Sequence, residues 1–131
     1  MKPLGIRDGI SPLGLKVLVL EDEMVIAVLM EDLLAELGCE VVGTASSVSQ
    51  ALELADNTRP DAALLDLHLR GGESGYAVAD VLAERDVPFA FVTGYSADML
   101  RPPHDGRPVL EKPFWTSSLA SVLRDLATPA N

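Results

Sequence analysis

Five short apolar runs, separated by segments in which apolar residues recur at helical spacing, constrain the fold of this chain most strongly. The runs are Val17–Leu20, Val41–Val42, Ala62–Leu65, Phe89–Val92 and Val109–Leu110. Continuous runs of this length are typical of strands that are buried on both faces. Strands that alternate with helices predict a parallel sheet with helices on both faces, which is an α/β fold.

Five helices are expected, one after each run. The first begins near Met24 and ends before Gly38, because glycine commonly ends helices. The others centre on apolar residues within 51–54, 78–82, 97–100 and 119–126. The segment near Ala97–Leu100 is short, and its helical pattern is weak.

The chain is predicted to form one domain with a short tail. Residues 1–14 are expected to be flexible, because their glycines and prolines interrupt any regular element. Residues 15–128 then form a single domain, as expected for 131 residues, with no output domain.

Composition excludes several classes of function. The formal net charge of −10 opposes phosphate backbones, so direct nucleic-acid binding is not expected. No apolar run approaches the roughly 18 residues of a membrane span, and a secretory signal is not expected, because no long apolar stretch precedes Lys16. The single cysteine, Cys39, cannot form an internal disulfide and is expected to be a small core residue. We therefore expect a cytoplasmic protein.

Polar residues follow four of the apolar runs. The set consists of Glu21, Asp22, Asp66, Thr93 and Lys112. Because ligands bind at the carboxyl ends of parallel strands, these side chains are expected to converge at one edge of the sheet. Clustered carboxylates repel one another unless a cation lies among them, and hard oxygen ligands favour magnesium. An acid pair, an acid, a hydroxyl and an ammonium together indicate a metal and phosphoryl site.

Each of these residues also has a simpler interpretation. Glu21 and Asp22 are equally suited to cap the helix that begins near Met24. Thr93 is an ordinary β-branched strand residue, and Lys112 is an ordinary surface charge when considered alone. Such a simple interpretation is much less suited to Asp66, because this carboxylate ends a buried run.

These residues, in this order, resemble the receiver domain of two-component response regulators. The resemblance implies a flavodoxin-like, doubly wound sheet with strand order 2-1-3-4-5. It implies that Asp66 is the phosphoacceptor, and that Thr93 and Lys112 bind the phosphoryl oxygens. Magnesium, or alternatively manganese, would be held by Asp22, Asp66 and the backbone carbonyl of His68, with Glu21 acting through a water. The Lys112–Pro113 peptide bond is expected to be cis.

Other positions are expected to tune the site. By resemblance, His68 and Tyr95 would control the water that hydrolyses the phosphoaspartate. Most receivers carry an aromatic switch residue three positions before the lysine, whereas Val109 stands there in this chain. Gly94 would then allow the fourth loop to move in place of that aromatic residue.

Two segments resemble an atypical receiver subgroup nicknamed FATGUY. They are Phe91-Val92-Thr93-Gly94-Tyr95 and Pro113-Phe114-Trp115. Members of that subgroup tend to pair with HWE-type sensor histidine kinases, and they often have no output domain.

The expected function is therefore a stand-alone receiver. It would take a phosphoryl group from a sensor histidine kinase or a histidine phosphotransfer protein onto Asp66, and would signal by protein contact or act as a phosphate sink. It would not be an enzyme, apart from catalysing its own phosphorylation and dephosphorylation. The alternative is a receiver-fold module that docks without phosphorylation. A phosphatase of the haloacid dehalogenase type would need Asp-x-Asp where this chain has Glu21-Asp22-Glu23.

Overall fold

The computed structural model describes residues 14–94 and 100–128, which form a five-stranded parallel sheet in the order β2-β1-β3-β4-β5. This confirms the predicted fold class and strand order. The strands are β1 (Lys16–Leu20), β2 (Glu40–Ala45), β3 (Ala62–Asp66), β4 (Phe89–Thr93) and β5 (Val109–Glu111). The helices are α1 (Met24–Glu36), α2 (Val48–Thr58), α3 (Tyr76–Glu84) and α4 (Thr116–Ala127).

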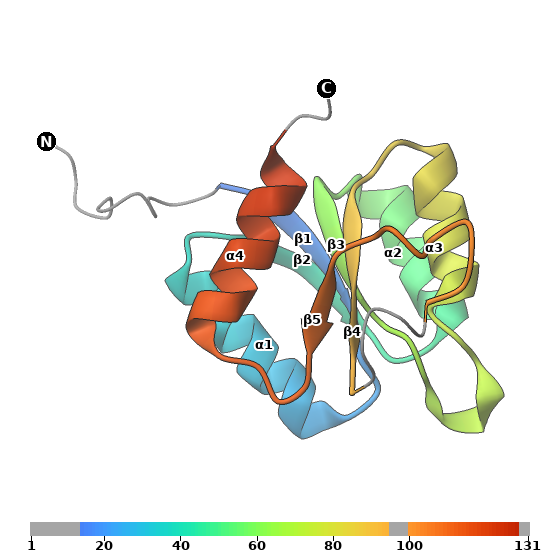
Figure 1. Cartoon of the computed structure of the whole chain (residues 1–131), viewed down its shortest axis with the longest axis horizontal. Coiled ribbons are helices and arrows are strands. Elements are labelled where there is room, and N and C mark those ends of the chain that lie inside the picture. The colour runs from blue at the N-terminus through green and yellow to red at the C-terminus, as the bar shows by residue number, and fades with distance from the viewer. Residues whose placement is uncertain (1–13, 95–99, 129–131) are drawn as a thin grey trace, which may run out of the picture.

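Two helices cover each face of the sheet: α1 and α4 lie on one side, and α2 and α3 on the other (Figure 1). The described residues thus contain four α-helices, where the sequence predicted five. The missing helix was expected near Ala97–Leu100, and residues 95–99 lie outside the described part of the chain. The described remainder of that connection, residues 100–108, contains turns and no helix.

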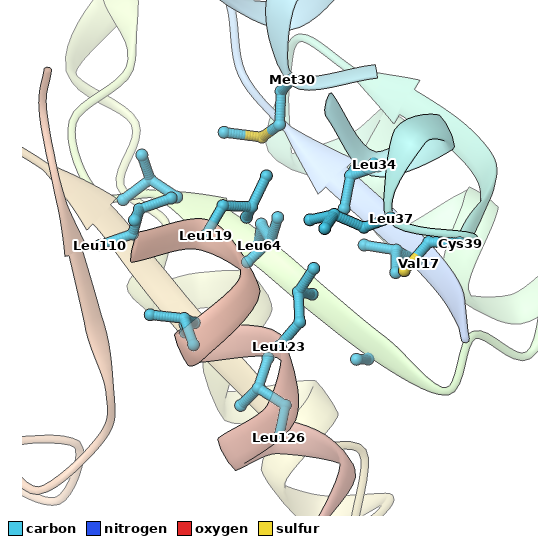
Figure 2. Close-up of a cluster of buried hydrophobic side chains, with 14 of the residues drawn as sticks. Val17, Met30, Leu34, Leu37, Cys39, Leu64, Leu110, Leu119, Leu123 and Leu126 are labelled. Atoms are coloured by element: carbon cyan, nitrogen blue, oxygen red, sulfur yellow. The ribbon is translucent and has the colours of Figure 1, made fainter. Parts of the chain in front are cut away.

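The core consists of two hydrophobic clusters, one on each face of the sheet. Alternate side chains of one strand enter different clusters, so Val17 and Val19 pack on one face and Leu18 and Leu20 on the other. Figure 2 shows the first cluster, in which α1 and α4 pack against the sheet. Cys39 belongs to this cluster, and burial raises the pKa of its thiol. It is the small core residue that the sequence predicted.

Local signals explain where the helices begin and end. The Ser47 hydroxyl caps α2 by accepting a hydrogen bond from the Gln50 N–H at 3.3 Å. After α1, Gly38 adopts a φ of 80°, a left-handed conformation that favours glycine. No helix within the described ranges has the length and apolar character needed to cross a membrane.

Candidate functional site

The carboxyl ends of four strands bring the predicted site residues together. Asp66 and Thr93 end β3 and β4, and both are buried. Glu21 directly follows β1, and Lys112 directly follows β5. The Lys112 N–H continues the sheet by donating to the Thr93 carbonyl at 2.9 Å. A hollow of about 380 Å³ opens at this edge, and its lining includes Asp22, Asp66, Thr93 and Lys112.

Three carboxylates in this site have the arrangement of a metal-binding cluster. One oxygen each from Glu21, Asp22 and Asp66 lies within 4.8 Å of the other two. Burial raises the pKa of Asp66 to about 7, and the charge of Glu21 adds to this effect, while Lys112 and the His68 N–H oppose it. A divalent cation among these oxygens would offset their repulsion and favour the ionised form of Asp66. The residues therefore fit the magnesium ion that the sequence predicted.

Glu21 is a buried member of the three-carboxylate cluster and already has a cationic partner. Its side chain is fully buried, and its Oε1 lies 3.1 Å from Lys112 Nζ as an ion pair. A buried carboxylate requires such a partner, because an unpaired buried charge is costly.

Lys112 connects two of the three carboxylates. Its Nζ lies 3.5 Å from Asp66 Oδ2, in addition to its contact with Glu21. Burial alone would lower the pKa of Lys112, but the contacts with Glu21 and Asp66 outweigh it and raise the pKa. The ammonium therefore stays charged beside Asp66. The Lys112–Pro113 bond is cis, as expected, and a second cis bond joins Pro102 to Pro103.

The contacts separate the helix-capping interpretation of Glu21 from that of Asp22. The N-cap residue of α1 is Glu23, whose side chain makes no capping hydrogen bond. Glu21 Oε2 accepts from the Glu23 N–H at 3.1 Å, so Glu21 contacts the start of the helix as well as Lys112. Asp22 Oδ2 instead accepts from the Arg70 N–H at 2.7 Å, across to the loop after β3, and among the described residues it makes no contact of this kind with the helix.

The loop after β3 holds residues that sequence reasoning partly missed. The exposed His68 donates its N–H to Asp66 Oδ1 at 3.4 Å, while metal ligation by its carbonyl stays a prediction. Gly75 has no room for a side chain, because a Cβ there would come within 2.4 Å of the Asp66 carbonyl oxygen. Arg70, whose guanidinium Nε lies 3.9 Å from Asp22 Oδ2, is not among the site residues that the sequence predicted. No local pattern marks either residue, since each matters through a contact with a strand end.

The predicted tuning residues have different outcomes. Tyr95 lies outside the described residues. Gly94 is exposed, and a Cβ there would meet nothing within 4 Å, so the described contacts do not explain a glycine. Val109 is half-buried and packs against the second hydrophobic cluster. Phe114 is buried, whereas Trp115 is 72% exposed.

His104 has a structural environment that the sequence did not reveal. Its ring is buried among Tyr76, Phe89 and Phe91, with centroid separations of 5.5 to 6.2 Å. His104 Nε2 lies 2.8 Å from Asp80 Oδ1 on α3. This residue therefore attaches the connection between β4 and β5 to the rest of the domain.

Comparisons with known proteins agree with the geometry. Residues 17–124 match the family described as the response regulator receiver domain. The chain is 33% identical over 123 residues to the phyllosphere-induced regulator PhyR of Methylorubrum extorquens, covering 89% of this chain and 45% of that protein. It is 31% identical over 111 residues to the transcriptional regulatory protein PdtaR of Mycobacterium tuberculosis, covering 82% of this chain and 54% of that protein. The chain thus spans about half the length of these two relatives.

Solved structures give closer agreement in length. The solution structure of SdrG from Sphingomonas melonis Fr1 superposes with a TM-score of 0.78 at 42% identity, covering 88% of this chain and 98% of that one. The receiver domain of PhyR from Erythrobacter litoralis gives a TM-score of 0.77 at 33% identity, covering 90% of this chain and 96% of that one. The fold, the arrangement of acids and lysine at the strand ends and these matches lead to one conclusion: the chain belongs to the response regulator receiver domain family.

Proposed function

We propose that this protein accepts a phosphoryl group on Asp66 in a reaction that requires magnesium. The observation that carries the proposal is the convergence of Asp66 with Glu21, Asp22 and Lys112 at one sheet edge of a receiver domain. The donor would be a phosphohistidine of a sensor histidine kinase, for example one of the HWE type, or of a histidine phosphotransfer protein. The product would signal by protein contact or serve as a phosphate sink.

The reaction would be a displacement at phosphorus. An Asp66 carboxylate oxygen attacks, the new O–P bond forms, and the P–N bond to the donor histidine breaks. The electron pair of that bond returns to the imidazole, which leaves as neutral histidine after taking up a proton. With acetyl phosphate as donor, a P–O bond breaks instead and acetate leaves.

The side chains around Asp66 have defined roles in this proposal. Bound magnesium would supply positive charge to the phosphoryl oxygens, and Glu21, Asp22, Asp66 and the His68 carbonyl would hold it, with manganese as an alternative ion. Lys112, which already contacts Asp66 Oδ2 at 3.5 Å, would neutralise another phosphoryl oxygen. Thr93 lines the same hollow and would donate to a third.

The protein would thus catalyse its own phosphorylation and dephosphorylation rather than turn over a separate substrate. Two solved relatives from Bartonella quintana are the anti-anti-sigma factor PhyR, and this chain covers 50% and 46% of those chains. The name of that protein points to partner binding as an output of related receivers. A partner protein, rather than nucleic acid, is also the recipient that a net charge of −10 favours here.

Intact-mass measurement tests the proposal directly. The protein is incubated with acetyl phosphate or phosphoramidate and magnesium, and we expect the mass of one phosphoryl group to be added. The gain should disappear with a chelator and in Asp66→Asn, and it should persist in Asp105→Asn, which removes an exposed acid from the connection before β5. If neither donor modifies the wild type, the rival interpretation applies, in which the domain docks to partners without phosphorylation.

A further inference from the structure

Arg70 makes two contacts with the same oxygen of Asp22, which is one of the three clustered carboxylates. Its backbone N–H donates to Asp22 Oδ2 at 2.7 Å, and its guanidinium Nε lies 3.9 Å from that oxygen. The Asp22 side chain is 10% exposed, whereas the Arg70 side chain is 77% exposed. The Asp22 side chain is therefore mostly sheltered, while the exposed guanidinium can change its position at low cost.

The surrounding loop fixes the backbone of Arg70. Leu69 before it is buried, and its N–H donates to the Glu73 carbonyl at 3.0 Å. The Glu73 side chain in turn accepts from the Val48 N–H at the start of α2, also at 3.0 Å. Gly71 and Gly72, with φ values of 81° and 87°, complete the turn. These contacts hold the base of the arginine side chain beside the mouth of the site.

Charge counting shows why a second cation matters there. Three carboxylates and Lys112 give the site a formal charge of −2, which a divalent ion brings to zero. Converting ionised Asp66 to an acyl phosphate removes one negative charge and adds up to two. The phosphorylated, metal-bound site is then left with one uncompensated negative charge. Among the described residues that line the hollow, Arg70 and Lys112 are the two with permanently cationic side chains.

We propose that Arg70 is a phosphoryl-binding residue of this site, with a guanidinium that moves from Asp22 to the phosphoryl oxygens when Asp66 is modified. Before modification, the guanidinium partly neutralises Asp22 and competes with the metal ion. After modification, it supplies the missing positive charge to the acyl phosphate. This inference rests on the proposed function, because it assigns one more residue to the same reaction.

The proposal predicts two effects of opposite sign in Arg70→Gln. Magnesium should bind more tightly, because Asp22 loses a competing cation. The phosphoryl analogue beryllofluoride, added with saturating magnesium, should bind more weakly, because the analogue loses a cationic partner. A side chain this exposed is worth up to about 1 kcal/mol in each interaction, so each dissociation constant should change by about two- to fivefold.

Amide chemical shifts provide the measurement, since they follow magnesium and beryllofluoride titrations separately and also report whether the fold is intact. The variants are Arg70→Gln, Arg70→Lys, and Arg124→Gln as a charge-matched control on the exposed side of α4. Arg70→Lys should keep most of both wild-type affinities, and Arg124→Gln should match the wild type.

The outcomes separate this inference from the proposed function. Tighter magnesium binding with weaker beryllofluoride binding in Arg70→Gln supports the inference, because a merely loosened loop would weaken both. Two unchanged constants, or two weakened ones, overturn it. If the wild type neither binds beryllofluoride nor gains a phosphoryl group, the proposed function fails and this inference fails with it. If the wild type does both and Arg70→Gln behaves identically, this inference fails alone.

Discussion

Replacing Asp66 with asparagine should stabilise the metal-free protein, and the gain should depend on pH. The pKa of Asp66 rises from 3.8 to about 7 in the folded protein, chiefly through burial and then through the charge of Glu21. Between these values the folded state retains a proton that the unfolded state has lost. The contribution of Asp66 to the free energy of unfolding is therefore fully present below about pH 4, and it is lost as the pH rises through about 7. Asparagine carries no such charge at any pH.

The size of the effect follows from the same pKa change. A rise from 3.8 to about 7 corresponds to at most about 4 kcal/mol of unfolding free energy. Relaxation of the site and entry of water reduce this, so we expect about 1–3 kcal/mol at pH 8. For a domain of this size, that is a rise in Tm of about 4–12 °C. Saturating magnesium should reduce the difference in stability between Asp66→Asn and the wild type, because it binds the folded wild type and favours ionised Asp66.

Urea unfolding of Asp66→Asn and the wild type at pH 5 and pH 8, with a chelator or with magnesium, measures this difference in stability and its dependence on pH and metal. Asp105→Asn, an exposed acid on the connection before β5, is the control and should show no pH-dependent gain. The reasoning would be refuted by equal stabilities of Asp66→Asn and the wild type at pH 8 without metal. A difference that is the same at both pH values would refute it as well, because it would come from packing rather than from charge.

Three further substitutions test the packing around the site. Leu64→Ala, at a fully buried position of β3, should cost about 2–5 kcal/mol in urea unfolding. Gly75→Ala should destabilise the domain by about 1–3 kcal/mol and slow phosphorylation, because its Cβ would come within 2.4 Å of a carbonyl oxygen of β3. Gly106→Ala is the control, because a Cβ at that position meets nothing within 4 Å, and it should show neither effect. Asp80→Ala should cost about 1–3 kcal/mol by removing the partner of the buried His104 ring, seen as a lower Tm with unchanged phosphorylation of Asp66.

The predictable parts of the fold are those in which the burial of an element in the folded domain produces a recognisable pattern in its own sequence. β3 is buried on both faces, so Ala62–Leu65 had to be a continuous apolar run, and the run itself revealed the strand. The strand order could not be predicted in this way, because it followed from the family resemblance and not from the periodicity of apolar residues. The segment near Ala97–Leu100 had a weak pattern, and the described part of that connection contains turns held by His104 and by the Arg101 N–H, which donates to the Tyr76 hydroxyl at 2.9 Å.

The same distinction applies to the site. Asp66 was predictable because it is a charged residue at the end of a buried run, and Lys112 because it lies after a short apolar run and directly before a proline. Arg70 and Gly75 were not, because each acts on a strand end from a loop, and a loop sequence gives no sign of what it touches. Their roles depend on contacts between segments that are distant in the chain, such as the 2.7 Å hydrogen bond from Arg70 to Asp22.

The hydrophobic core stabilises the folded domain, whereas the clustered carboxylates of the site destabilise it. The two hydrophobic clusters bury apolar side chains on both faces of the sheet, and they hold the strand ends in place. At those ends, Asp66, Glu21 and Asp22 are held close together, although their charges repel one another. The packing of the core therefore keeps the three carboxylates close together, and they would move apart if the strand ends were less rigidly held. That arrangement has a chemical use, because carboxylates that cannot separate favour the binding of a cation among them.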